Sequence, residues 1–211
     1  MDKTKIMQPN SKRKLQTSPD TCEIILHESG LAPVAGVDEA GRGPLAGPVV
    51  ACAIILPPGL IIESVNDSKK LSESRRKALA ETIKAAAMAY SYGIIDAATI
   101  DKINIHEATL LAMAQAIEAL ELRPKVLMVD GKFPPKAPCP TLHIIKGDMH
   151  SHLIAAASIL AKVARDEIMQ DIHREHPQYG FDKHKGYGTK AHKAALTKHG
   201  PCIVHRASFK F

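Results

Sequence analysis

A strand–turn–strand segment with two acidic residues at its centre constrains the fold more than any other part of the chain. An apolar run at residues 34–37 leads into Asp38 and Glu39, and a glycine-rich turn at residues 41–47 leads into a second apolar run at residues 49–56. Because side chains alternate between the two faces of a strand, Asp38 and Glu39 can serve one site only where the strand ends and the backbone turns. We therefore predict two neighbouring strands, the first closed by Asp38, with a carboxylate site at the turn between them.

The turn carries groups suited to an anionic ligand. Gly41 and Gly43 permit positive φ and let a ligand approach bare backbone amides, and Arg42 offers a planar cation that suits a phosphate. The glycine spacing matches neither the dinucleotide-binding fingerprint nor a P-loop. An Asp-Glu pair before a glycine turn is, by itself, usually a solvated loop. Carboxylates for a metal beside amides and a guanidinium for a phosphate nevertheless suggest metal-dependent chemistry on a phosphodiester.

The bulk properties are those of one basic domain. The 211 residues carry a net charge of +6, and residues 1–20 hold five lysines and arginines with almost nothing to bury. We expect a disordered basic arm at residues 1–20 and a single, monomeric domain at residues 21–211. No apolar run approaches the roughly 20 residues of a membrane span. The four cysteines form no Cys-x-x-Cys pair, so we expect reduced thiols and a cytoplasmic protein without membrane contact.

Hydrophobic periodicity and capping residues predict the order of the elements. Strands are expected at residues 33–38, 48–56, 90–95, 125–131 and 141–145, and helices at about 21–30, 72–88, 106–120, 152–173 and 190–198. Ser72 and Asn104 are predicted to cap the second and third helices. Three strands in succession, followed by helix, strand, loop and strand, predict an α/β fold with a mixed five-stranded sheet flanked by helices and a helical C-terminal extension.

Acidic residues stand at the ends of three predicted strands. Asp38 closes the first strand, Asp130 closes the fourth, and Asp148 follows the fifth. If these strands are parallel and adjacent, their carboxyl ends place the acids around one crevice. Asp38, Glu39, Asp130 and Asp148 would then supply enough carboxylates for two Mg²⁺ or Mn²⁺ ions, which prefer such oxygen ligands. The remaining acids considered are interpreted as caps or surface residues: Asp67, Asp96, Asp101 and Asp166.

Seven blocks of sequence form a pattern that runs along most of the chain. They are Gly36-Val37-Asp38-Glu39-Ala40-Gly41-Arg42-Gly43-Pro44, Asp67-Ser68-Lys69-Lys70-Leu71, Val129-Asp130-Gly131, Lys146-Gly147-Asp148, Ala155-Ala156-Ala157-Ser158-Ile159-Leu160-Ala161-Lys162-Val163, His184-Lys185-Gly186-Tyr187-Gly188-Thr189 and His205-Arg206-x-Ser208-Phe209. Together these blocks resemble the type 2 ribonucleases H (ribonuclease HII). The resemblance implies a ribonuclease H-like fold. It also implies a metal-dependent endonuclease that acts on RNA–DNA hybrids and on duplex DNA containing ribonucleotides, and that cleaves 5′ of the ribonucleotide to leave a 3′-hydroxyl and a 5′-phosphate.

The resemblance also implies roles for individual residues. The acids matching Asp38, Glu39, Asp130 and Asp148 bind the metal ions in that family. Gly41, Arg42 and Gly43 are expected to contact the ribose 2′-hydroxyl and the adjacent phosphate, and Tyr187 to stack on the following deoxyribose. Phosphate contacts fix the register of a protein on a duplex, and the candidates for them are Lys69, Lys70 and Lys146.

Two other classes of function fit the four acids and the glycine turn less well, a phosphotransferase and a non-catalytic binding module. A metal-dependent phosphotransferase could employ the acids, but the sequence has no nucleotide-binding loop of a known type. A non-catalytic hybrid-binding module would gain nothing from four clustered acids, which repel each other unless a cation is bound. Arg42 also disfavours the related ribonuclease HIII. One position departs from the family pattern, because Leu153 stands where a serine is frequent.

Overall fold

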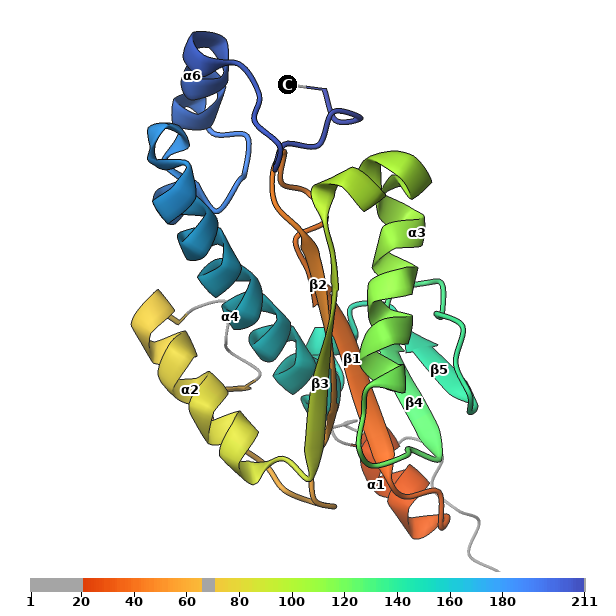
Figure 1. The fold of residues 1–211 in the computed structure, drawn as a ribbon. Coiled ribbons are helices and arrows are strands. Elements are labelled where there is room, and N and C mark those ends of the chain that lie inside the picture. The colour runs from red at the N-terminus through yellow and green to blue at the C-terminus, as the bar shows by residue number, and fades with distance from the viewer. Residues whose placement is uncertain (1–20, 66–70, 211) are drawn as a thin grey trace, which may run out of the picture.

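A computed structural model describes residues 21–65 and 71–210 and shows one mixed five-stranded sheet with helices on both faces (Figure 1). The predicted basic arm, Asp67, Lys69 and Lys70 lie outside the described residues. The strands are β1 (Val34–Ala40), β2 (Val49–Ile55), β3 (Ala89–Ile95), β4 (Val126–Asp130) and β5 (Thr141–Ile144). The α-helices are α1 (Thr21–Glu28), α2 (Glu73–Ala86), α3 (Ala97–Glu118), α4 (His152–Glu175), α5 (Phe181–His184) and α6 (Lys190–His199), with short 3₁₀ helices η2 (Gly147–Met149) and η3 (Pro177–Tyr179).

The strand order is β3-β2-β1-β4-β5. The pairs β1–β2 and β2–β3 are antiparallel, whereas β1–β4 and β4–β5 are parallel. The predicted α/β class, the mixed sheet and the parallel arrangement of the three acid-bearing strands are therefore confirmed. β1 lies at the centre, and its alternating side chains pack against helices on both faces of the sheet.

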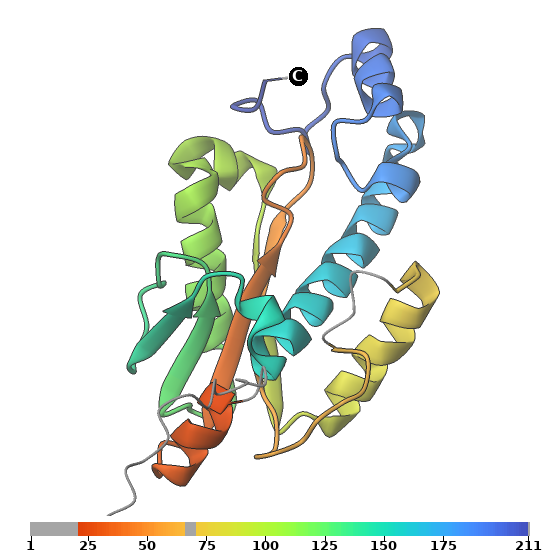
Figure 2. The ribbon, with the colours of Figure 1, turned by 180° about the vertical axis from the view of Figure 1, so that it is seen from behind.

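Helix α3 covers one face of the sheet, and α4 with α2 covers the other (Figures 1 and 2). Ala35 and Val37 of β1 belong to the core under α3, while Val34 belongs to the core under α4. Gly36 lies so close to α4 that a Cβ atom there would overlap the Leu153 backbone. Leu153 is buried, and its amide donates to the Glu23 carboxylate. The backbone N–H at this position therefore has a partner without the serine that is frequent there.

Helix α3 differs from the prediction because it begins at Ala97 rather than near His106. Asp96 caps this first segment by accepting from the Thr99 amide. Asn104 interrupts the helix with φ 68° and ψ 165°, and its side chain accepts from the His106 and Glu107 amides. The predicted cap at Asn104 is thus confirmed, but it caps the second of two helical segments that follow one another.

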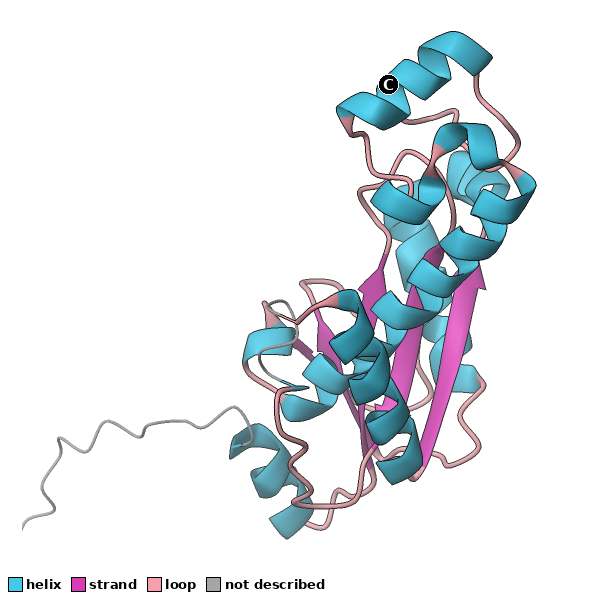
Figure 3. Ribbon diagram, turned by 90° about the vertical axis from the view of Figure 1, so that its left-hand side faces the viewer, coloured by secondary structure: helices cyan, strands magenta, loops and turns pink. Residues whose placement is uncertain are grey.

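The helical C-terminal extension lies beyond the end of the sheet, next to the β1–β2 turn (Figure 3). An isolated bridge pairs Ala46 of that turn with His205, and the Gly47 amide donates to the Val204 carbonyl. η3 and α5 were not predicted as elements, whereas the predicted helix at residues 190–198 corresponds to α6. Within the described ranges, no helix is long and apolar enough to cross a bilayer.

Candidate active site

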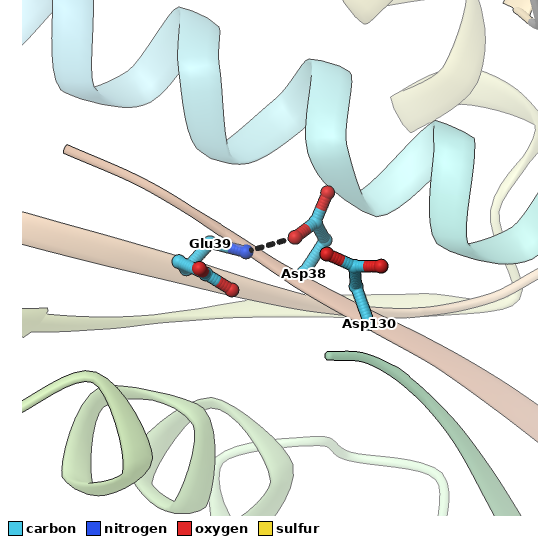
Figure 4. Close-up of side chains that lie close together, drawn as sticks. All are labelled: Asp38, Glu39 and Asp130. Atoms are coloured by element: carbon cyan, nitrogen blue, oxygen red, sulfur yellow. Dashed lines mark hydrogen bonds between the residues drawn. The ribbon is translucent and has the colours of Figure 1, made fainter. Parts of the chain in front are cut away.

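Three carboxylates meet at the centre of the sheet. Asp38 and Glu39 come from β1, and Asp130 is the last residue of β4 (Figure 4). One oxygen of each lies within 4.8 Å of the others, and the Glu39 amide donates to Asp38 Oδ1 at 2.7 Å. Among the residues that the structure describes, this is the one group of three or more acids, histidines or cysteines so arranged.

The prediction that β1 ends at Asp38 is wrong, because the strand continues to Ala40. Asp38 and Glu39 therefore point to opposite faces of the sheet. They nevertheless reach one site because the pairing of β1 with β4 stops at Val37 and Val129, while its pairing with β2 continues to Ala40. The edge of β1 is thus free of β4 from Asp38 onward, and side chains from either face can converge beside it.

Burial and mutual repulsion make these acids hard to ionise together. Asp38 is 5% exposed, and burial raises its pKa well above the usual value, with the charges of Glu39 and Asp130 raising it further. Burial also raises the pKa of Glu39, partly opposed by the Arg42 guanidinium. A cation between the carboxylates would compensate their charge, and hard oxygen donors fit Mg²⁺ or Mn²⁺ better than softer ions. The donor set thus fits a divalent metal site.

Helix α4 adds polar groups to the site that are not among the predicted site residues. A hydrogen bond from the Ser158 hydroxyl opposes the rise in the Asp38 pKa. Ser158 and Lys162 line a cleft with Glu39, Gly41 and Tyr187. Arg76 of α2 also lines this cleft. The available signal was the spacing of Ser158 and Lys162, because residues four apart share one face of a helix and both interrupt an apolar run.

Asp148 is not part of the cluster of three. It lies half-buried on η2, directly after Gly147, whose amide donates to Asp130 Oδ1 at 2.6 Å. The backbone of η2 therefore touches the site, although the Asp148 carboxylate lies farther away. Lys146 is exposed and precedes η2 in the left-handed conformation, at φ 58°.

The predicted substrate-binding turn lies next to Tyr187. A Cβ atom at Gly43 would approach the Tyr187 ring to 3.8 Å, so the turn and the tyrosine border the same space. Gly41 has φ +100°, as predicted, but its bare side faces Arg165. Gly43 has no positive φ, which corrects that expectation. Arg42 is exposed, and its Nη1 lies 3.4 Å from Glu39 Oε1.

Tyr187 stands in a loop between α5 and α6. Its side chain is 44% exposed, and its ring centroid lies 6.0 Å from Lys162 Nζ. Its backbone is fixed, because the amide donates to the His184 carbonyl and the Tyr187 carbonyl accepts from the Thr189 amide and from His192 Nδ1. The ring is thus presented to solvent on a well-held backbone.

The remaining sequence-based assignments have mixed outcomes. Asp96 is a helix cap, as predicted. Asp101 accepts from the amides of Ala207 and Ser208 and so holds the C-terminal segment. The surface assignment of Asp166 is wrong, because this residue of α4 is buried and its Oδ1 lies 2.6 Å from Lys162 Nζ.

Comparisons with known proteins agree with this geometry. The model of the family described as Ribonuclease HII matches residues 35–211. A Ribonuclease HII of Chlamydia trachomatis serovar A is 55% identical over 183 residues, which cover 86% of this chain and 84% of that protein.

Solved structures show the same fold. The ribonuclease H2 from Pyrococcus horikoshii OT3 superimposes with a TM-score of 0.73 at 24% identity and covers 84% of this chain and 93% of its own. The RNase HII of Archaeoglobus fulgidus, solved in a complex with PCNA, gives a TM-score of 0.71 at 26% identity, over 84% of this chain and 95% of that one. The chain therefore belongs to the ribonuclease HII family, whose members are metal-dependent nucleases that hydrolyse phosphodiester bonds of RNA in RNA–DNA hybrids.

Proposed function

We propose that the chain is an endonuclease that cuts on the 5′ side of a ribonucleotide, in hybrids and in duplex DNA that contains single ribonucleotides. The products are a 3′-hydroxyl and a 5′-phosphate. In the cell this activity would remove misincorporated ribonucleotides and RNA primers during DNA replication and repair, with the chain acting as a cytoplasmic monomer.

One observation carries the proposal. The oxygens of Asp38, Glu39 and Asp130 gather within 4.8 Å, and Glu39 also lines the cleft that contains Gly41 and Tyr187. A phosphodiester in that cleft would contact Glu39 and Gly41, with the other two carboxylates next to Glu39. A bond in this position would lie next to both a metal site and groups that can recognise the adjoining sugar.

Asp38, Glu39 and Asp130 would hold two divalent ions, Mn²⁺ or Mg²⁺, and Asp148 would join them from η2 with a modest shift of that short helix. Such ions, when bound, activate the attacking water and stabilise the leaving oxygen. The Gly147 amide holds Asp130 Oδ1 in place, which leaves Oδ2 free to act as a ligand. Lys146, Lys69 and Lys70 would contact flanking phosphates and fix the register of the duplex.

Selection of RNA over DNA needs groups close to the sugar, because one 2′-hydroxyl separates the two at a single nucleotide. The backbone amides around Gly41, Arg42 and Gly43 can approach that hydroxyl and the adjacent phosphate without a bulky side chain in the way. Tyr187 would stack on the following deoxyribose, where an added hydroxyl would clash with the ring. The Tyr187 ring lies so near Gly43 that a Cβ atom there would contact it. This closeness supports the proposal that the glycine turn and the Tyr187 loop together recognise one RNA–DNA junction; we call the two segments the junction reader.

The test is cleavage of a labelled duplex with one embedded ribonucleotide, with Mg²⁺, with Mn²⁺ and with a chelator. We expect a single cut 5′ of the ribonucleotide, only with metal, and a product that a DNA polymerase extends because its end is a 3′-hydroxyl. An all-DNA duplex of the same sequence is the control. Cleavage 3′ of the ribonucleotide, or equal cleavage of the all-DNA duplex, would contradict the proposal.

A further inference from the structure

Arg206, in the C-terminal segment, holds the substrate-binding turn by its carbonyl groups. The side chain is 0% exposed. It donates to Gly41 O at 2.6 Å, to Arg42 O at 2.9 Å and twice to Gly47 O, at 2.8 and 3.0 Å. All its side-chain hydrogen bonds within the described residues go to the backbone of this one turn.

These bonds determine where the amides of the turn point. In a planar trans peptide the N–H of one residue points opposite to the C=O of the residue before it. With Gly41 O and Arg42 O directed at the buried guanidinium, the amides of Arg42 and Gly43 point away from it. Both residues are exposed, so their amides are turned away from the buried guanidinium and toward the surface of the turn.

His205, the neighbour of Arg206, is connected to the Tyr187 backbone through His192. The Cys202 amide donates to His205 Nδ1 at 2.9 Å, His205 Nε2 lies 3.1 Å from His192 Nε2, and His192 Nδ1 lies 3.0 Å from Tyr187 O. His192 is 0% and His205 5% exposed. Two buried imidazoles thus link the C-terminal segment to the loop that presents Tyr187.

The direction of this chain of hydrogen bonds is determined by its two ends. Tyr187 O only accepts, so His192 Nδ1 carries the proton. His205 Nδ1 lies 2.9 Å from the Cys202 amide, which only donates, and 3.3 Å from the Cys202 carbonyl. The shorter contact assigns His205 Nδ1 as an acceptor, which leaves the proton of this ring on Nε2. His205 Nε2–H must therefore donate to His192 Nε2. Both rings are neutral in this arrangement. The titratable groups packed around the pair are His176, His184 and Cys202, together with Tyr179.

We propose that Arg206, His205 and His192 are positioning residues: Arg206 aims the amides of the glycine turn, and the two histidines hold Tyr187 at a fixed distance from that turn. Adjacent residues of one segment thereby set both halves of the junction reader. The inference rests on the proposed function of the turn and of Tyr187, and it assigns a role to the His205-Arg206 motif.

The first experiment uses two replacements of His192 that mimic different ring nitrogens. The amide nitrogen of His192→Asn can replace Nδ1 and donate to Tyr187 O, whereas His192→Gln reaches toward His205 and loses Tyr187. Substrates are a duplex with one ribonucleotide and a long RNA–DNA hybrid. We expect His192→Gln to raise KM about tenfold on the single ribonucleotide with little change in kcat, and His192→Asn to retain most of the wild-type preference. His199→Gln, an exposed histidine of the same helix, is the matched control.

A merely structural role would give a different order, because His192→Gln preserves the buried contact with His205 and His192→Asn does not. Equal losses for the two variants, or a smaller loss for His192→Gln, would overturn the inference. Combining His192→Gln with Tyr187→Ala distinguishes a failure of the proposed role of Tyr187 from a failure of the positioning role of His192. If Tyr187→Ala leaves the junction preference intact, the proposed role of Tyr187 fails. If Tyr187→Ala raises KM on the single ribonucleotide, and adding His192→Gln in that background raises it again by the same factor as in the wild type, the positioning role fails alone.

The second experiment tests the turn with Arg206→Lys, which keeps the charge but cannot reach the Gly41, Arg42 and Gly47 carbonyls together. We expect KM to rise about tenfold or more on both substrates, because both contain the 2′-hydroxyl and phosphate that the turn would contact. The metal concentration for half-maximal activity should stay the same. Arg174→Lys is the comparison, because Arg174 is an exposed arginine of α4 that bonds to Asp171 and not to the turn. An unchanged KM in folded Arg206→Lys, or an equal rise in both variants, would overturn the inference.

Discussion

Asp130 connects two requirements of the site at the scale of a single residue. Its carboxylate contributes to the repulsion that raises the pKa of Asp38 and Glu39, and one of its oxygens accepts the Gly147 amide. An asparagine would remove the charge and keep an oxygen for that amide. Loss of metal binding and loss of fold can therefore be separated at this position.

For Asp130→Asn we expect activity with Mg²⁺ or Mn²⁺ to fall by at least about a hundredfold, because one anionic ligand of the ions is lost. The melting temperature of the metal-free protein should hold or rise, since a buried like-charge repulsion is relieved. Cleavage assays with each ion and thermal unfolding in chelator provide the two measurements. Near wild-type cleavage with both ions would show that Asp130 is not a ligand.

Ser158 acts on Asp38 through one hydroxyl. A hydrogen bond to a charged group contributes roughly 1.5–3 kcal/mol. For Ser158→Ala we therefore expect the Mg²⁺ concentration for half-maximal activity to rise about tenfold, with a smaller change in kcat at saturating metal. A metal titration of initial rates measures both quantities. Ser74→Ala, on the exposed surface of α2, is the control. A titration curve identical to that of the wild type would remove Ser158 from the site.

At the scale of elements, the ends of strands and helices explain what the sequence could predict. The order of strands, the parallel arrangement of β1, β4 and β5, and the caps at Ser72 and Asn104 follow from periodicity and from local hydrogen bonding. The convergence of Asp38 and Glu39 does not. It depends on β4 ending before β1 does, which is a property of the pairing between distant segments.

Other errors have the same origin. Ser158 and Lys162 look like interruptions of a packed helix until β1 is placed beside α4. Gly41 looks like a bare surface for a ligand until Arg165 fills the space next to it. The first segment of α3 was missed because it is short and is followed immediately by a second cap. Local sequence patterns thus predict elements, while side-chain partners more than a hundred residues away decide what a residue does.

Asn104 in α3 tests the two-segment interpretation of that helix. It combines a positive φ, which favours glycine, with a cap for two amides. Asn104→Ala loses the cap and keeps the strain, so we expect the free energy of unfolding to fall by about 2 kcal/mol. Asn104→Gly loses the cap but relieves the strain and should cost less. Urea denaturation of both variants measures the difference; a smaller loss for alanine than for glycine would contradict the assignment.

At the scale of the whole molecule, His205 in the C-terminal segment and Asp38 in the carboxylate site change the stability with pH in opposite directions. Burial, together with the charge that His192 carries when protonated, lowers the pKa of His205 to about 4. The folded state then binds fewer protons than the unfolded state, so this stabilisation is complete above about pH 6.5 and is lost as the pH falls toward 4. The raised pKa of Asp38 works the other way: without metal, the folded state keeps a proton that the unfolded state releases, so stability falls as the pH rises.

The variant His205→Asn isolates the histidine contribution, because the carboxylates are the same in both proteins and cancel in the difference. We expect wild type to exceed His205→Asn in unfolding free energy at pH 7.5, and this excess to shrink by about 1–3 kcal/mol on going to pH 4.5. Urea denaturation in chelator at several pH values measures it. A difference that does not change with pH would show that His205 does not titrate differently in the two states.

The bonds from Arg206 to Gly41, Arg42 and Gly47 join residues about 160 positions apart in the sequence. During synthesis, the carboxylate-bearing strand β1 and its turn leave the ribosome long before the guanidinium that shapes the turn has been made. A nascent chain can therefore form part of the sheet before the amides of Arg42 and Gly43, which would contact the ribose, are held in one orientation. The shape of this turn therefore depends on contacts of long range in sequence, and its amides acquire their orientation only when Arg206 packs against Gly41, Arg42 and Gly47.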